Sequence, residues 1–248
     1  LVTRNFKKAI DVWGADHHGH VRRMKTAMQA LGIDSNRLDV VLMQLVKLMG
    51  DAKDENGNVI LDESGKPKKV EIRMSKRTGK AIALVDLLDE VPIDAARFFF
   101  NTREPNSHLI FDLDLAIQEN SENPVYYVQY AHARICSILR ALERENLTYN
   151  EGDTINLALL TDPSEIELIR TLSYMPNEII AAGKGYDPSR ITKYSVSLAT
   201  AFHRFYTACR VMGEDSELSK ARLALCVASK HAIANCLKIM NITIPEKM

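Results

Sequence analysis

The strongest constraint on the fold is a change in hydrophobic spacing near residue 113. From there to residue 248, apolar residues recur every three or four positions, which is the spacing of one face of an α-helix. Asn123 followed by Pro124 is typical of a helix start, because asparagine caps free backbone N–H groups and proline fits the first turn. The apolar stripe behind this start comprises Val125, Val128, Ile135, Ile138 and Leu142.

Three further helical stripes follow. Ser164 and Glu167 have the spacing of a capping box, and Asp187 with Pro188 opens another helix. Because each stripe needs a partner stripe, residues 113–248 are predicted to form an all-α helical bundle. The inward residues expected on these helices are Ile169, Leu172 and Met175, then Ile191, Leu198, Phe202 and Phe205, and finally Leu225, Ile233, Leu237 and Met240.

Residues 1–112 mix strand-like and helix-like segments. An apolar run at residues 9–13 predicts a buried strand, and residues 17–31 have helical spacing that ends at Gly32. Residues 38–49 are apolar again and predict a second strand, with a helix as the open alternative. The order strand–helix–strand favours a parallel α/β unit, so the chain is predicted to be α/β over residues 1–112 and all-α over residues 113–248.

The composition narrows the class of protein. Lys plus Arg number 32 and Asp plus Glu number 32, so the chain is not a polycation that binds nucleic acid through its net charge. No apolar run approaches the roughly 18 residues of a membrane span. The four cysteines lie far apart within apolar helical patterns. This spacing predicts buried, reduced thiols in a cytoplasmic protein.

The first candidate site is the segment 13–20, Trp-Gly-Ala-Asp-His-His-Gly-His. A glycine after a strand lets a ligand approach the backbone, an acidic side chain accepts hydrogen bonds from ribose hydroxyls, and a helix N-terminus attracts anions. Gly14, Asp16, His17 and His18 are therefore candidates for a nucleotide site. A helix cap with surface histidines is an equally open alternative. A metal site is not predicted, because the segment supplies no further ligand or second shell.

The second candidate site is a basic segment between residues 66 and 80, which carries seven basic residues and one acid. Its serine, glycine and clustered lysines suit a loop that wraps phosphates, although a solvated basic loop would have the same composition. Gly79-Lys80 is not a Walker loop, because the earlier glycine and the following Ser or Thr are absent.

The third candidate site lies between residues 187 and 238, where there are eight Lys or Arg and four acids. Cations and aromatic rings alternate there, and such a surface can clamp and stack unpaired bases. The alternative is that the tyrosines belong to the core and the cations are solvated. The residues concerned are Lys193, Tyr194, Arg204, Tyr206 and Arg210.

Several of these segments together resemble one family. Residues 73–77, Arg-Met-Ser-Lys-Arg, are similar to the KMSKS loop of class I aminoacyl-tRNA synthetases, with arginine in place of the first lysine and of the final serine. The final residues 244–248, Ile-Pro-Glu-Lys-Met, are similar to the C-terminus of bacterial arginyl-tRNA synthetases. Further segments also resemble bacterial arginyl-tRNA synthetases. These segments are residues 13–20, 111–116, 123–134 and 202–206.

His17-His18-Gly19-His20 superficially fits HIGH, the other signature of class I synthetases. In that class HIGH follows the first strand of the nucleotide fold, far upstream of KMSKS, whereas here only a short interval separates His20 from Arg73. The resemblance therefore implies that the HIGH motif and much of the arginine pocket lie upstream of residue 1. The 248 residues alone are expected to be inactive.

The resemblance implies the C-terminal part of a Rossmann-like catalytic domain followed by an anticodon-binding bundle, in a monomeric enzyme. ATP, accompanied by Mg²⁺, and arginine would give arginyl-adenylate, and the arginyl group would then pass to tRNA. The implied roles are catalysis for Lys76 and Ser75, ATP binding for Gly14, Asp16, His17, His18, Arg73, Met74 and Arg77, and tRNA binding for Lys193, Arg204, Tyr206 and Arg210.

Two rival hypotheses stay open. The first is a class I synthetase of another specificity, because nothing in these residues selects arginine by its chemistry. The second is a non-catalytic module that binds tRNA or another RNA through the helical bundle and carries a vestigial nucleotide domain.

Overall fold

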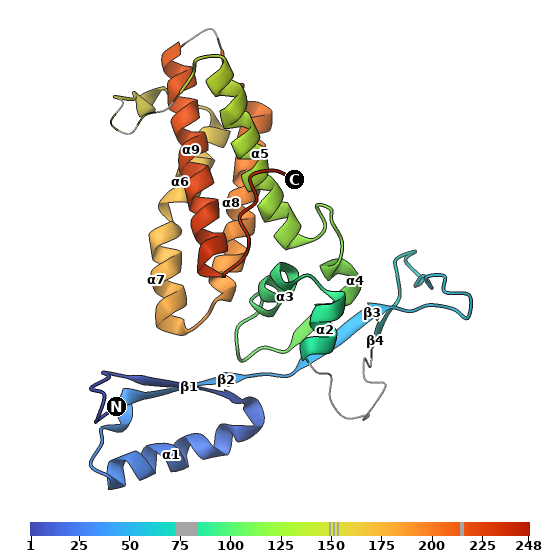
Figure 1. Ribbon diagram of the computed structural model, residues 1–248, viewed down its shortest axis with the longest axis vertical. Coiled ribbons are helices and arrows are strands. Elements are labelled where there is room, and N and C mark those ends of the chain that lie inside the picture. Colours follow the sequence, from blue (N-terminus) through green and yellow to red (C-terminus); the bar gives the residue numbers. More distant parts are fainter. Residues whose placement is uncertain (73–83, 149, 151, 153, 214–215) are drawn as a thin grey trace. The chain divides into compact units, whose positions relative to one another are not determined.

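The computed structural model describes residues 1–72, 84–148, 150, 152, 154–213 and 216–248 (Figure 1). The described chain forms two compact units. The first comprises residues 1–72 and 103–112, and the second comprises residues 84–102 and 113–248. The α/β class of the first unit and the helical class of the second are as predicted, and the short helices of residues 84–102 group with the bundle.

The first unit begins with a parallel β–α–β arrangement. Strand β1 (Ala9–Gly14) leads through a 3-10 turn into helix α1 (His18–Ala30), and β2 (Leu38–Met43) then pairs with β1 in parallel. The predicted parallel unit is thus confirmed. Gly32, at φ 72°, follows the helix in a Schellman motif, with N–H donors of residues 32 and 33 bound to carbonyls of residues 29 and 28.

A second, three-stranded sheet belongs to the same unit. Its order is β4–β3–β5, with β3 (Val46–Asp51) antiparallel to β4 (Lys69–Glu71) and parallel to β5 (Leu109–Asp112). The prediction of one strand over residues 38–49 is therefore wrong. The chain leaves the first sheet at Gln44, whose N–H donates to the carbonyl of residue 105 at 2.8 Å, and starts a strand of the other sheet.

Strand β1 is present but is not buried as predicted. In the described chain the side chains of Ile10 and Val12 are 51% and 64% exposed. The physical reason is that a sheet of two strands with one helix beside it cannot cover both of its faces.

The polar stretch between β3 and β4 folds back on itself through two tight turns. Gly57 and Gly65 have φ of 84° and 79°, and in each turn an aspartate three residues earlier accepts backbone N–H bonds through one carboxylate oxygen. Those aspartates are Asp54 and Asp62. Side-chain hydrogen bonds from Asn58 and Ser64, together with these backbone bonds, lower the pKa of the two carboxyl groups, because they stabilise the charged form.

The second unit is helical and is organised around α8, which contacts α5, α6, α7 and α9 (Figure 1). The predicted inward residues of the first, third and last helices are buried, which confirms those stripes. No helix within the described residues is long and apolar enough to cross a membrane. The helices are α2 (Leu84–Glu90), α3 (Ile93–Phe100), α4 (Leu113–Ala116), α5 (Pro124–Arg144), α6 (Pro163–Ser173), α7 (Met175–Gly185), α8 (Ser189–Ala208) and α9 (Ser216–Ile239).

Helix α6 differs from the prediction. Its capping box pairs Asp162 with Glu165, rather than Ser164 with Glu167, because Pro163 occupies the first helical position and sets the start. The inward face shifts accordingly: the side chain of Leu168 is fully buried, whereas that of Ile169 is 38% exposed. Helix α7 was not predicted as a separate helix.

The four cysteines, Cys136, Cys209, Cys226 and Cys236, are free thiols and all are buried, as predicted. Burial raises the pKa of each, for Cys226 and Cys236 to about 12. These thiols therefore stay protonated near neutral pH and contribute to the core as small apolar side chains.

Candidate functional site

The first candidate site lies at the carboxyl end of the parallel strand pair. Gly14 ends β1 opposite Met43 of β2, and the following residues form the turn into α1. A Cβ atom on Gly14 would come within 2.6 Å of the Asp16 Oδ1 atom. Glycine at this position therefore lets the Asp16 carboxylate fold back against the strand end, since a larger residue would displace it.

Asp16, His17 and His18 are all exposed around this strand end. The Asp16 Oδ1 atom lies 3.8 Å from His17 Nε2, and the rings of His17 and His20 are 5.6 Å apart. The carboxylate therefore faces solvent and can accept hydrogen bonds from a ligand. Among the residues that the structure describes, no three His, Cys, Asp or Glu side chains lie close enough together to bind a metal ion.

The basic candidates Arg73, Met74, Ser75, Lys76 and Arg77 lie outside the described residues, so their roles stay predictions. The strand that precedes them is β4, Lys69–Glu71. Lys69 is a structural residue, because its Nζ atom lies 2.7 Å from carboxylate oxygens of both Asp51 and Asp112. Burial disfavours the charged amine, but the two carboxylates outweigh this effect and raise the pKa of Lys69.

The four candidates for tRNA binding do not form one group. Tyr206 and Arg210 line a common hollow of about 470 Å³ beside α5. Arg204 lines a neighbouring hollow of about 450 Å³. Lys193 is exposed three helical turns earlier on α8, about 16 Å along the axis, where its amine donates to Ser189 Oγ at 3.2 Å.

Tyr194, the remaining aromatic residue of this region, belongs to the core. Its side chain is 7% exposed, and its hydroxyl donates to the Thr171 carbonyl at 3.1 Å. Burial raises the pKa of Tyr194 strongly, so the phenol stays neutral. The alternative that sequence analysis left open is therefore correct at this position.

The structure adds residues to which sequence analysis assigned no role. Tyr127, Tyr130 and Arg134 are spaced along α5, and their side chains meet His203 and Tyr206 of α8. The ring centroid of His203 lies 5.2 Å from that of Tyr127 and 6.3 Å from that of Tyr130. The guanidinium of Arg134 lies 5.0 Å from the Tyr206 ring centroid. The signal in the sequence was the spacing of three, then four residues, which places all three on one helix face.

We call Tyr127, Tyr130, Arg134, His203 and Tyr206 the aromatic cluster. Burial and the charge of Arg134 lower the pKa of His203, so its ring is neutral at neutral pH. Tyr130 is 41% exposed, which leaves aromatic surface available to a ligand. A neutral aromatic platform with a cation beside it suits the stacking of an unpaired nucleobase.

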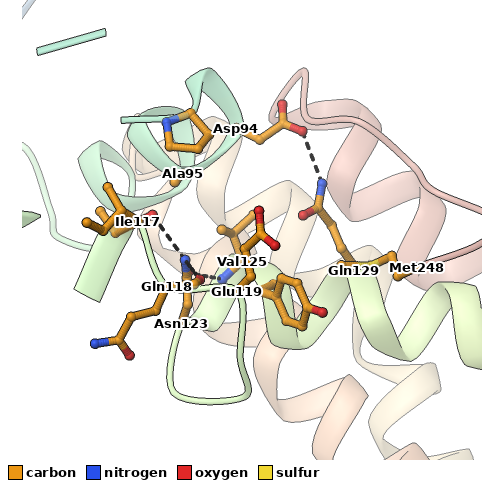
Figure 2. A pocket seen from close by; sticks show the side chains of 12 residues that line it. Asp94, Ala95, Ile117, Gln118, Glu119, Asn123, Val125, Gln129 and Met248 are labelled. Atoms are coloured by element: carbon orange, nitrogen blue, oxygen red, sulfur yellow. Dashed lines mark hydrogen bonds between the residues drawn. The ribbon is translucent and has the colours of Figure 1, made fainter. Parts of the chain in front are cut away.

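The end of the chain is held along α5. Gln129 Nε2 donates to both Asp94 Oδ2 and the Thr243 carbonyl at 3.0 Å, and His132 Nδ1 donates to the Pro245 carbonyl at 2.8 Å. Figure 2 shows Gln129, Asp94 and Met248 around a hollow of about 370 Å³. The final residues are thus an ordered part of the helical unit.

Comparison with known proteins matches the helical part of the chain to one domain family. Residues 128–248 match the model of the DALR anticodon binding domain. This range contains most of the aromatic cluster, together with the segment that ends the chain.

Comparison also matches the chain over its whole length. It is 53% identical over 248 residues to an arginine--tRNA ligase of Caldanaerobacter subterraneus subsp. tengcongensis, and 49% identical over 245 residues to one of Ruminiclostridium cellulolyticum. The match covers 100% and 99% of this chain, respectively. The chain spans about two fifths of the length of these relatives, 41% and 40%.

Solved structures have the same fold. An arginyl-tRNA synthetase structure from Campylobacter jejuni is 30% identical, with a TM-score of 0.76 over 99% of this chain and 49% of that one. The arginyl-tRNA synthetase of Thermus thermophilus is 19% identical and has a TM-score of 0.73 over 98% of this chain and 41% of that one, which supports the fold alone. The chain is therefore similar over its whole length to part of the arginine--tRNA ligases, and its residues 128–248 match the DALR anticodon binding domain family.

Proposed function

We propose that the chain is a working part of an arginine--tRNA ligase, which joins arginine to its tRNA in two ATP-dependent steps. Residues 1–112 would belong to the catalytic domain and residues 113–248 to the anticodon-binding domain. Two observations support this reaction: the relatives are named arginine--tRNA ligases, and their similarity extends over the whole of this chain. The observation that carries the proposal within this chain is the aromatic cluster on the domain matched to anticodon binding.

The first step is the attack of the arginine carboxylate on the α-phosphate of ATP, with pyrophosphate leaving. Gly14 and Asp16 would hold the adenosine, with the carboxylate accepting hydrogen bonds from ribose hydroxyls and His17 or His18 beside it. Lys76 would stabilise the charge that develops on pyrophosphate, assisted by Ser75, Arg73, Met74 and Arg77. The exposed carboxylate beside Gly14 supports this role for the strand end.

Mg²⁺ would accompany ATP and polarise its phosphates. The described residues offer no cluster of three carboxylates or histidines, so the phosphates and water are the expected ligands of the ion.

The helical unit would bind the tRNA anticodon. Bases of an unpaired loop can stack on Tyr130 and Tyr206, while Arg134, Arg204 and Arg210 supply positive charge to the phosphates. Lys193 would make a more distant phosphate contact. This division follows from the two hollows beside α8 and from the separation of Lys193 along that helix.

The test is tRNA binding by the full-length protein at fixed ionic strength. Tyr206→Ala and Arg134→Gln should each weaken the affinity for its tRNA by about tenfold, the low end of the effect of losing one stacked base. Tyr174→Ala is the matched control, because Tyr174 is 53% exposed on the same unit and lies outside the cluster. Unchanged affinity in both cluster variants would contradict the proposed role of the cluster.

A further inference from the structure

Residues 209–213, which follow α8, are held from two sides. Cys209 and Val211 are buried, and the side chain of Arg210 between them is exposed. The Sγ atom of Cys209 lies 3.4 Å from Ser164 Oγ on α6. On the other side, the Gly213 N–H donates to Ser219 Oγ of α9 at 3.0 Å. The segment is therefore fixed to both neighbouring helices.

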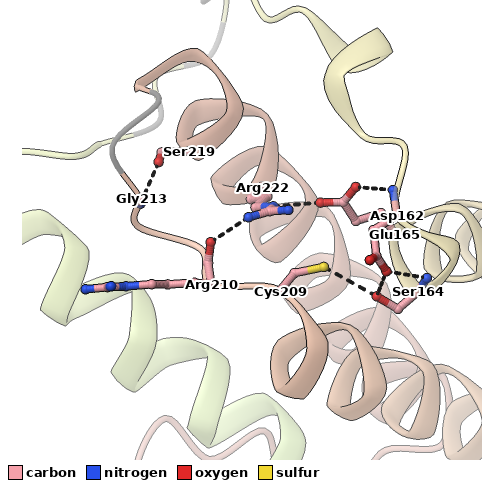
Figure 3. A network of polar contacts seen from close by, with 8 residues as sticks. All are labelled: Asp162, Ser164, Glu165, Cys209, Arg210, Gly213, Ser219 and Arg222. Atoms are coloured by element: carbon pink, nitrogen blue, oxygen red, sulfur yellow. Dashed lines mark hydrogen bonds and ion pairs between the residues drawn. The ribbon is translucent and has the colours of Figure 1, made fainter.

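A buried ion pair supplies the central contact, as Figure 3 shows. The Nε atom of Arg222 on α9 donates to Glu165 Oε1 at 2.6 Å, and its Nη1 atom donates to the carbonyl of Arg210 at 2.8 Å. The side chain of Glu165 is only 1% exposed and that of Arg222 is 17% exposed. The other Glu165 oxygen accepts from the Asp162 N–H at 2.9 Å, so the carboxylate is itself fixed.

The planar guanidinium matters here, because its two donors point in different, fixed directions. One donor binds Glu165 and the other binds the Arg210 carbonyl. A lysine ammonium lacks this rigid, planar pair of donors. The Arg210 side chain extends away from the network in Figure 3, and it lines a hollow together with Ile138 and Leu142 of α5.

We propose that Arg222 is a positioning residue for tRNA binding: held by buried Glu165, it fixes the Arg210 backbone and so directs the Arg210 side chain toward the RNA. This inference rests on the proposed function, in which Arg210 contacts tRNA. Arg222 itself makes no contact with the RNA and acts through Arg210.

The test compares tRNA affinity, and KM and kcat for charging, in the full-length protein carrying Arg222→Lys, Arg210→Ala or both. Lysine keeps a positive charge beside Glu165 but cannot bind Glu165 and the Arg210 carbonyl with the same fixed geometry. We expect Arg222→Lys to raise Kd and KM for tRNA about tenfold, to change kcat by less than about twofold, and to have little effect in the Arg210→Ala background. Arg190→Lys is the control, because Arg190 forms a more exposed ion pair with Glu178 at 2.9 Å elsewhere in the bundle.

An effect of Arg222→Lys that is equally large with and without Arg210 would overturn the inference, as would a loss of kcat at unchanged KM. Normal tRNA binding by Arg210→Ala would also overturn it, while wild-type charging of tRNA would leave the proposed function standing. If Arg222→Lys unfolds the domain, Ser219→Ala releases the same segment at Gly213 without touching the ion pair. Ser219→Ala should weaken tRNA binding severalfold only when Arg210 is present. Equal weakening in the wild-type and Arg210→Ala backgrounds would refute the inference.

Discussion

Replacing Asn123 with alanine should destabilise the helical unit by about 2–4 kcal/mol. Asn123 is 3% exposed at the start of α5, the helix that carries three members of the aromatic cluster. Its side-chain oxygen accepts from the Val125 N–H at 3.2 Å. Its amide nitrogen donates to the carbonyls of Ala116 and Gln118 at 3.1 and 2.8 Å (Figure 2). One side chain thus caps the helix and ties the preceding loop to it.

The magnitude has two parts. Losing the cap of a helix costs about 1 kcal/mol. The bond to the Ala116 carbonyl is buried, so its loss leaves an unsatisfied acceptor, which costs about 1–3 kcal/mol. The Gln118 carbonyl is only partly buried, and water can replace its donor.

The assay is urea unfolding followed by far-ultraviolet circular dichroism, which reports the helices. Fluorescence of the single tryptophan, Trp13 in the first unit, serves as an internal reference. Asn156→Ala is the matched control, because Asn156 caps a short, exposed 3-10 turn and its loss should cost at most about 1 kcal/mol.

Asn123→Asp separates the two parts. Aspartate caps a helix as well as asparagine does, but it cannot donate to the two carbonyls. The buried negative charge of aspartate would also face the two carbonyl oxygens, and this repulsion outweighs the retained cap, so Asn123→Asp should be at least as destabilising as Asn123→Ala. Wild-type stability of Asn123→Asp, or equal losses in Asn123→Ala and Asn156→Ala, would refute the reasoning.

Three further predictions concern activity and pH. In the full-length protein, Lys76→Ala should lower the rate of adenylate formation at least about 10²-fold, and a native rate would refute its role. Gly14→Ala should weaken ATP binding about tenfold by displacing Asp16. Gly19→Ala is the control and should not weaken it, because a Cβ atom at Gly19 meets nothing within 4 Å. Equal ATP affinities of the two variants would contradict the strand-end site. Burial lowers the pKa of His132, so the unfolded chain takes up the proton first as pH falls. The unfolding free energy should then drop below about pH 6.5, and His132→Gln should reduce that drop in urea titrations; an unchanged pH dependence would contradict the argument.

The long amphipathic helices could be predicted because burial of one face decides their structure. Helices α5, α8 and α9 bury the residues that their spacing indicates. Helix α7 escaped prediction because it has no buried residue in the described chain and contains Pro176, Gly183 and Gly185. Where a helix contributes little to the core, apolar spacing carries little information about its limits.

The candidate sites were predictable to different degrees. The position of Gly14 at a strand end follows from local sequence, and its steric role toward Asp16 appears only in the structure. The aromatic cluster joins α5 to α8, so side chains more than 65 positions apart meet only through helix packing. Spacing along α5 places its three members on one helix face, but their meeting with the two members on α8 depends on tertiary structure.

The proposed reaction is tested most directly by aminoacylation of tRNA by the full-length protein, with each of the standard amino acids supplied separately together with ATP. Arginine alone should be attached. Charging with a different amino acid would show a class I synthetase of another specificity. Binding of tRNA without charging by any amino acid would show a non-catalytic module, and either result would contradict the proposed function.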